Sequence, residues 1–128
     1  MRLLLDTCTF LWALTGEPSL PSRVAALFRD PENDVFLSAA SAWEIAQKYS
    51  RGRLVLPEPP ERCIPFEREA RAIASLAIDE ESTLHASRLP FHHRDPFDRL
   101  IVSQAIVHGL TILTPDPLIS RYSARVIW

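Results

Sequence analysis

The chain is poor in the residues that build disulfide, zinc and membrane proteins. Its 128 residues include two cysteines, Cys8 and Cys63, which lie far apart and form no C-x-x-C motif. This argues against a disulfide scaffold and a cysteine-based zinc site, and it favours a reducing, cytoplasmic setting. No apolar run approaches the roughly 20 residues that span a bilayer, and the first charges come too early for a signal peptide. We therefore expect no membrane association.

Glycine and an excess of charge are also missing. Three glycines form no Gly-rich loop, which excludes a kinase-like nucleotide site. The net charge of −2 gives no global basic field to attract nucleic acid. Lys48 is the only lysine among 14 basic residues, and the arginine bias suits phosphate contacts but also follows from a GC-rich genome. With 47% hydrophobic and 23% charged residues, the chain is predicted to form one globular domain over residues 1–128.

Short apolar strands alternate with helical segments along the chain. Strands are expected at 3–5, 35–37, 76–78, 110–113 and 125–128. Helices are expected at 7–14, 19–28, 38–49, 66–75, 79–89, 96–108 and 116–122. The proline-rich stretch 57–65 is expected to be a surface loop. Strands that alternate with helices imply a parallel sheet covered on both faces, so the sequence predicts an α/β fold: a three-layer α/β/α sandwich with a central, mainly parallel sheet.

Four acidic residues, distant in sequence, are predicted to gather at one edge of this sheet. Asp6 directly follows the first strand, and Glu44 lies early in the helix after the second. Asp98 lies in the first turn of its helix, and Asp116 follows the strand at 110–113. In open α/β sheets the crevice beyond the carboxyl ends of the strands binds ligands. Taken singly, Asp98 and Asp116 also fit the role of helix caps or turn residues, so a purely structural role stays open.

Carboxylates that converge within a few ångströms repel one another unless some bind protons or a cation neutralises them. Ligand sets made only of oxygen select a hard cation, so Mg²⁺ or Mn²⁺ is favoured over Zn²⁺. A cation held in this way lowers the pKa of a bound water and stabilises the charge that develops on a phosphodiester under attack. The acidic cluster therefore predicts metal-dependent phosphodiester cleavage.

Four segments carry a pattern of motifs that extends over essentially the whole chain. They are Leu3–Thr7, Ser38–Ile45, His93–Ile101 and Leu113–Asp116. In order and spacing these segments resemble the motifs of the PIN-domain ribonucleases, and specifically the VapC-type toxins of bacterial toxin–antitoxin pairs. Two positions depart from the family pattern: Cys8 stands where histidine is common, and Pro115 where a small residue is common. Neither departure removes a carboxylate.

The resemblance implies a PIN-like fold and a metal-dependent endoribonuclease. By this likeness Asp6 and Asp98 are direct ligands of Mg²⁺, with Mn²⁺ as a substitute. Glu44 and Asp116 complete the set of catalytic acids. Asp95 is an extra acid of the subgroup, which either joins the metal network, caps the following helix or pairs with an arginine.

The same resemblance implies partners and accessory residues. Thr7 and Thr114 are candidate accessory residues. Arg94 and Arg99 are candidate RNA-binding residues, although each taken alone also fits a solvated surface charge or an ion pair. The expected partners are an RNA substrate, a cognate antitoxin protein that holds the toxin inactive, and a second copy of the chain in a homodimer.

Two other functions compete with the nuclease. A catalytically silent interaction domain with the same fold would have no need of all four acids. A phospho-accepting α/β domain would need Asp-x-Asp after the first strand, where Asp6-Thr7-Cys8 lacks the second acid. A receiver-like version would need a lysine after a late strand, whereas the only lysine is Lys48.

Overall fold

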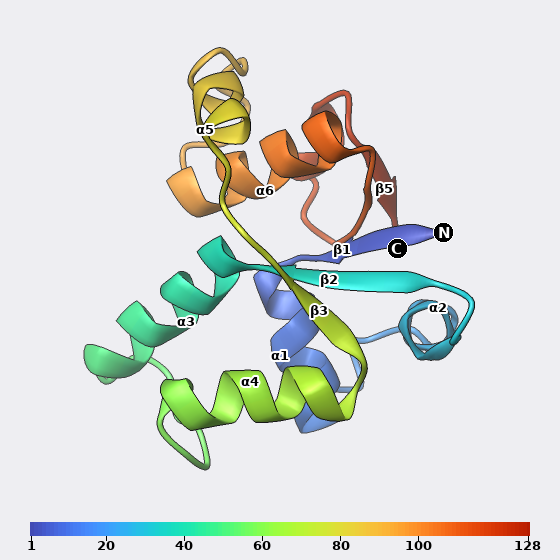
Figure 1. Cartoon of the computed structure of the whole chain (residues 1–128), viewed down its shortest axis with the longest axis vertical. Coiled ribbons are helices and arrows are strands. Elements are labelled where there is room, and N and C mark those ends of the chain that lie inside the picture. The colour runs from blue at the N-terminus through green and yellow to red at the C-terminus, as the bar shows by residue number, and fades with distance from the viewer.

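A five-stranded parallel sheet forms the centre of the computed structural model, which describes residues 1–128 (Figure 1). The strand order is β3-β2-β1-β4-β5, and every neighbouring pair is parallel. The strands are β1 (Arg2–Leu5), β2 (Asp34–Ser38), β3 (Ile73–Leu76), β4 (Thr111–Leu113) and β5 (Arg125–Ile127). The predicted central sheet is confirmed, with a fully parallel arrangement.

Helices cover both faces of the sheet and complete the predicted three layers (Figure 1). On one face lie α1 (Thr7–Thr15), α2 (Ser22–Arg29), α3 (Ala39–Ser50) and α4 (Pro60–Ala70). On the other lie α5 (Glu80–Ser87), α6 (Pro96–His108) and the short 3₁₀ turn η1 (Ile119–Arg121). None of these helices has the length and apolar character needed to cross a membrane.

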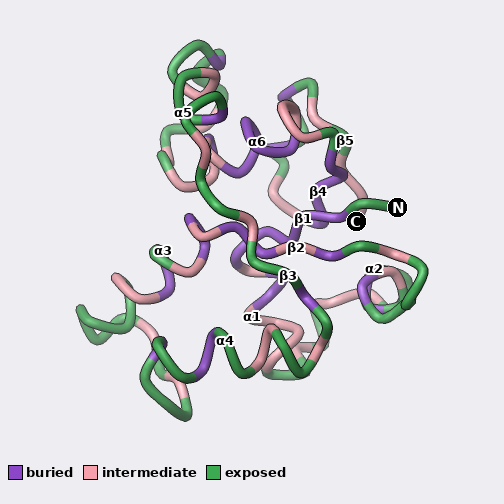
Figure 2. Tube along the Cα trace, in the orientation of Figure 1, coloured by how far each residue is buried: buried purple, intermediate pink, exposed green.

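Alternation along β1 divides the hydrophobic interior in two. Leu3 and Leu5 pack with Phe10 of α1 beneath one face, while Leu4 packs with Ile101 of α6 on the other. All of these side chains are fully buried, and Figure 2 shows the buried stretch running through the central strands. Burying both faces of β1 explains why it is a continuous apolar run that ends at the first acid.

Several element boundaries differ from the sequence predictions. The stretch 57–65 is not all loop, since α4 begins at Pro60, and Pro65 lies inside it on the exposed side. The helix expected at 66–75 ends at Ala70, and Ala72 then adopts a positive φ of 55° that turns the chain into β3. The third strand therefore lies at 73–76, earlier than the expected 76–78.

Two expected helices are shorter than predicted. The segment 19–28 becomes helical at Ser22, because Pro21 adopts an extended conformation as its N-cap. The segment 116–122 forms only the 3₁₀ turn η1. By contrast, α6 spans 96–108 as predicted, with Pro96 in its first turn and Gly109 in a left-handed C-cap.

The topology places a crevice at the carboxyl ends of β1 and β4. Chain order runs outwards from β1 to β3 on one side and from β4 to β5 on the other. In open parallel sheets this switch in direction separates the loops that follow adjacent strands and creates the usual ligand site. Asp6 follows β1 directly, and Thr114 follows β4.

Candidate metal centre

The four acids predicted from the sequence line one cavity of about 460 Å³ at this crevice. They come from four separate parts of the chain: the end of β1, helix α3, the first turn of α6 and the segment after β4. The cavity wall also includes Asp95, Thr7, Cys8 and Lys48. The structure thus brings together Asp6, Glu44, Asp98 and Asp116.

Asp6 is buried and held by three donors. The Thr7 amide donates to Oδ1 at 2.8 Å, the Thr114 hydroxyl donates to Oδ2 at 2.6 Å, and the Cys8 thiol lies 3.5 Å from Oδ2. Burial raises the pKa of the Asp6 carboxyl, and these hydrogen bonds offset part of the rise. Burial, followed by the nearby Asp6 charge, raises the pKa of the Cys8 thiol to about 12. Cys8 therefore remains a neutral donor in place of the more common histidine.

Glu44 is fixed by two side chains on opposite sides of its carboxylate. The Thr7 hydroxyl lies 2.7 Å from Oε1, and the Lys48 ammonium lies 2.8 Å from Oε2. The hydrogen bond to Glu44 is the main cause of the raised pKa of Lys48, which stays charged. Sequence analysis did not assign Lys48 to the site, although its spacing of four residues on the same helix was a usable signal.

Asp98 is the acid in the cavity whose carboxyl has the fewest hydrogen-bond partners. Burial raises the pKa of its carboxyl to about 8, with further contributions from the charges of Asp6, Asp95, Glu44 and Asp116. Its side chain accepts no hydrogen bond within the chain, and its nearest polar partner is the imidazole of His93, whose Nε2 lies 3.0 Å from Oδ2. A carboxylate with so little compensation is stabilised by a cation, which neutralises the surrounding negative charge.

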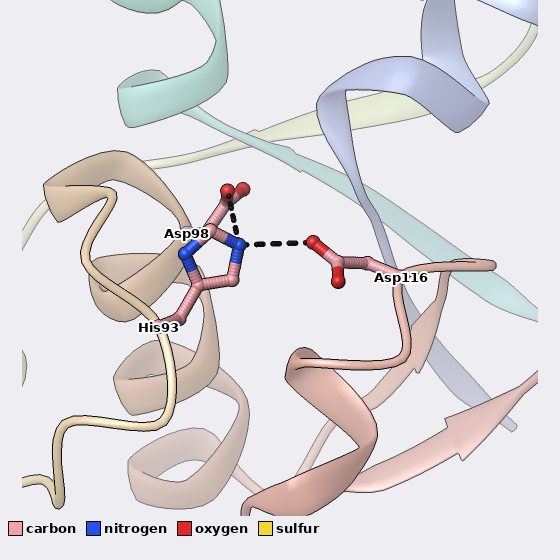
Figure 3. Close-up of side chains that lie close together, drawn as sticks. All are labelled: His93, Asp98 and Asp116. Carbon is pink, nitrogen blue, oxygen red and sulfur yellow. Dashed lines mark hydrogen bonds and ion pairs between the residues drawn. The ribbon is translucent and has the colours of Figure 1, made fainter.

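His93 lies between two of the acids (Figure 3). Its Nε2 atom is 3.0 Å from Oδ2 of Asp98 and 2.9 Å from Oδ2 of Asp116. Asp116 also accepts a hydrogen bond of 2.8 Å from the Leu118 amide. Sequence analysis did not place His93 in the site, because its position depends on the path of the loop before α6.

Asp95 lines the cavity and also caps α6. Its Oδ1 accepts hydrogen bonds from the amides of Phe97 at 2.8 Å and Asp98 at 3.3 Å. The capping role predicted as one alternative is therefore present in the structure. Its position in the cavity wall keeps the second alternative, a part in the metal network, as a proposal.

Arg99 requires a correction. It was expected to contact RNA, but it is 8% exposed and its guanidinium donates to the backbone carbonyls of Ala86 at 2.8 Å, Leu89 at 3.1 Å and Pro90 at 2.9 Å. These bonds fasten the loop before α6 and occupy both terminal nitrogens of the guanidinium. Arg94, the other candidate, is exposed and forms no ion pair.

The donor set fits a hard divalent cation. Five carboxylates line the cavity, and Lys48 is the only ammonium group among them. Burial, followed by the charges of the other acids, raises the pKa of Asp98 among them. Carboxylate oxygens are the ligands that Mg²⁺ and Mn²⁺ prefer, and no thiolate is available because the pKa of Cys8 is raised.

The chain is similar to proteins of one family across nearly its whole length. A family model described as PIN domain matches residues 3–124. Ribonuclease VapC16 from Mycobacterium tuberculosis is 32% identical to it, in an alignment that covers 66% of this chain and 74% of that protein.

Solved structures share the same fold. VapBC2 from Rickettsia felis, bound to a promoter DNA fragment, has a TM-score of 0.73 at 16% identity, covering 99% of this chain and 98% of that one. FitAcB from Neisseria gonorrhoeae has a TM-score of 0.66 at 22% identity, covering 98% and 96%. These identities support likeness of fold, and the family assignment rests on the match over residues 3–124. The chain belongs to the PIN-domain family.

Proposed function

We propose that this protein is a metal-dependent endoribonuclease and the toxin component of a toxin–antitoxin pair. The observation that carries the proposal is the convergence of Asp6, Glu44, Asp98 and Asp116 on one cavity at the switch point of the sheet. The raised pKa of Asp98 supports it, because burial and then the charges of the surrounding acids disfavour the ionised carboxyl, and a bound cation would offset both.

The comparisons support the substrate class and the partner. The curated relative at 32% identity is named a ribonuclease. Solved structures with the same fold are described as VapBC and toxin–antitoxin complexes. We therefore propose RNA as the substrate and an antitoxin protein as the partner, with a homodimer as the assembly.

In this proposal Asp6 and Asp98 hold Mg²⁺, or Mn²⁺ in its place. When bound, the cation supplies the positive charge that activates water and offsets charge on the phosphodiester. The Thr114 hydroxyl and the Thr7 amide fix the Asp6 carboxylate, so its oxygens keep their direction as the cation enters. Thr7 and Thr114 are thus proposed accessory residues.

Glu44 and Asp116 are proposed to orient the attacking water. Lys48 and Thr7 hold the Glu44 carboxylate in place, and Glu44 accepts a hydrogen bond from the water as it approaches phosphorus. Attack by water leaves a 5′-phosphate and a 3′-hydroxyl. Arg94, which is exposed next to the site, is proposed to contact the RNA phosphates.

The test is an RNA cleavage assay with the full chain, free of antitoxin and of metal. We expect cleavage with Mg²⁺ or Mn²⁺ and none with EDTA. Asp6→Asn is expected to abolish cleavage, whereas Asp34→Asn, an exposed carboxylate at the opposite end of the neighbouring strand, serves as the matched control.

Two results would contradict the proposal. Cleavage that persists in EDTA, or that survives Asp6→Asn, would end the metal-dependent mechanism. A folded chain that cleaves no RNA with either cation would favour the silent interaction domain instead.

A further inference from the structure

The loop before α6 supplies to the site a residue to which the sequence analysis assigned no role in catalysis or metal binding. We propose that His93 is a positioning residue, which holds the carboxylates of Asp98 and Asp116 in the arrangement that binds the divalent cation. This inference rests on the proposed function and adds a residue that acts through its neighbours.

Hydrogen bonding fixes which nitrogen of the ring carries the proton. Nδ1 accepts a hydrogen bond of 3.1 Å from the backbone amide of Asp95, so Nδ1 carries no proton. The proton of the neutral ring therefore lies on Nε2. Nε2 then donates its hydrogen bond to Asp116 at 2.9 Å and lies 3.0 Å from Oδ2 of Asp98 (Figure 3). His93 is therefore a donor to Asp116 and a close neighbour of Asp98, and its Nε2 lone pair is not free to bind a metal.

The two acids that His93 joins belong to different elements. Asp98 lies in the first turn of α6, and Asp116 follows β4. Nε2 lies within 3.0 Å of both carboxylates, and the Asp98 side chain accepts no hydrogen bond from elsewhere in the chain. Like charges brought together without a shared donor would push the side chains apart. The histidine thus sets the spacing of two carboxylates that the backbone alone does not link.

The backbone that carries the ring is held by contacts that do not involve the acids. The His93 amide donates to the Tyr122 hydroxyl at 2.9 Å, and that hydroxyl donates to the Pro90 carbonyl at 2.8 Å. Arg99 fastens the same loop from beneath through the Leu89 and Pro90 carbonyls. With a side chain 13% exposed, His93 is preorganised by the loop and is not simply drawn in by negative charge.

Residues that hydrogen-bond to metal ligands orient them, and their loss typically weakens metal binding by about 10- to 100-fold. The opposing interpretation is that His93 blocks the place of the cation. The two interpretations predict opposite changes in cation affinity when His93 is removed. Loss of a positioning donor weakens cation binding, whereas loss of a blocking group strengthens it.

The experiment titrates Mn²⁺ into the full metal-free chain and follows the free Mn²⁺ signal by electron paramagnetic resonance. We expect His93→Ala to raise the Kd for Mn²⁺ by about 10- to 100-fold. His93→Gln is expected to stay within about threefold of the original chain, because its amide nitrogen can take the place of Nε2. His92→Phe is the matched control, since it removes the exposed neighbouring imidazole, keeps an aromatic ring against Tyr122, and His92 contacts neither acid.

His93→Asn covers the case in which His93→Ala does not fold. Its amide is too short to reach both acids, so a folded His93→Asn chain with weakened binding, beside a His93→Gln chain that binds normally, supports the proposal. Unchanged or tighter Mn²⁺ binding by His93→Ala or His93→Asn overturns the proposal for His93. In that case, loss of Mn²⁺ binding in Asp98→Asn would still support the proposed function. If the original chain binds no Mn²⁺, both proposals fail.

Discussion

Thr114 donates a hydrogen bond of 2.6 Å to Oδ2 of Asp6, and this bond joins the ends of β4 and β1. Between these adjacent strands the order in which the chain adds strands to the sheet reverses. The bond therefore crosses the crevice that holds the acids. It also supplies one of only three donors to a buried carboxylate.

Thr114→Val tests the importance of this bond, because valine keeps the shape of threonine and removes the hydroxyl. We expect an increase of about 10-fold or more in the Kd for Mn²⁺ and a matching loss of RNA cleavage at limiting metal. Thr114→Ser restores the donor and is expected to behave like the original chain. Equal metal affinity in the valine and serine variants would show that the hydroxyl does not orient Asp6.

Asp98→Asn should abolish RNA cleavage and raise the free energy of unfolding at alkaline pH. The pKa of Asp98 is about 8 in the folded chain, against a usual value of 3.8. Between these pH values the folded chain keeps a proton that the unfolded chain has released, so stability falls as pH rises and the penalty is complete above pH 8.

Asparagine carries no charge and avoids this penalty. In EDTA at a pH of about 8.5 we expect Asp98→Asn to raise the free energy of unfolding by roughly 2 kcal/mol, a difference that shrinks towards acid pH. The same variant should cleave no RNA. Denaturant unfolding at several pH values measures the first effect, and a destabilised variant at alkaline pH would show that Asp98 is a structural residue.

Cation binding should strengthen as pH rises towards the pKa of Asp98. Below about 8 this carboxyl is mostly protonated, so a cation must displace the proton before it binds. We expect the apparent affinity for Mn²⁺ to rise by up to about tenfold per pH unit below that value and to level off above it. Calorimetric titration in buffers of different ionisation enthalpy measures the released proton, and pH-independent binding without proton release would contradict the assignment.

Asp95 and Asp98 should differ in importance although both line the cavity. Asp95→Asn keeps a side-chain oxygen for the α6 cap, so stability should change by less than about 1 kcal/mol. We expect it to reduce RNA cleavage less than Asp98→Asn does. Cleavage rates measured at saturating Mn²⁺ test this order, and a larger loss for Asp95→Asn would make Asp95 the principal metal ligand of this segment.

Replacing Arg99 should lower stability, whereas replacing Arg94 should weaken RNA binding. Arg99→Ala removes the guanidinium bonds to three backbone carbonyls, of which Pro90 keeps the Tyr122 hydroxyl and Ala86 keeps the Leu89 amide, so we expect it to lower the free energy of unfolding by about 2 kcal/mol or more. Arg94→Ala should leave stability unchanged and weaken binding of RNA, in a salt-dependent way. Thermal unfolding and RNA titration distinguish the two, and the reverse pattern would contradict both roles.

The sequence was sufficient to predict the layered α/β fold and the four acids. This is because buried parallel strands are short apolar runs, and the residue that follows such a strand lies at the ligand edge of the sheet. Asp6 and Asp116 could be placed by this rule alone.

Elements at the sheet edge were harder to predict. β3 is an edge strand whose Ala74 and Ser75 are exposed, so its pattern is weakly apolar and merges with the preceding helix. Pro65 within α4 argued for a loop, although a proline on the exposed side of a short helix is accommodated there.

Side chains whose roles depend on tertiary contacts could not be predicted from spacing. His93 reaches the acids because of the path of the loop before α6, and Arg99 is buried because carbonyls from the end of α5 and from this loop converge on it. Local sequence contains neither the path of this loop nor the direction of its carbonyls.

The bonds from Arg99 and Tyr122 hold the backbone of this loop, so the position of His93 does not depend on every side chain beside it. His92 and Arg94 are the exposed neighbours of His93, and their side chains make none of the bonds by which Arg99 and Tyr122 hold the backbone. The His92 ring packs against the ring of Tyr122, whereas Arg94 forms no such contact, so Arg94 can be replaced while the imidazole beside it stays where it is. The surface next to the proposed metal centre can therefore vary at this position without moving the residues that form the centre.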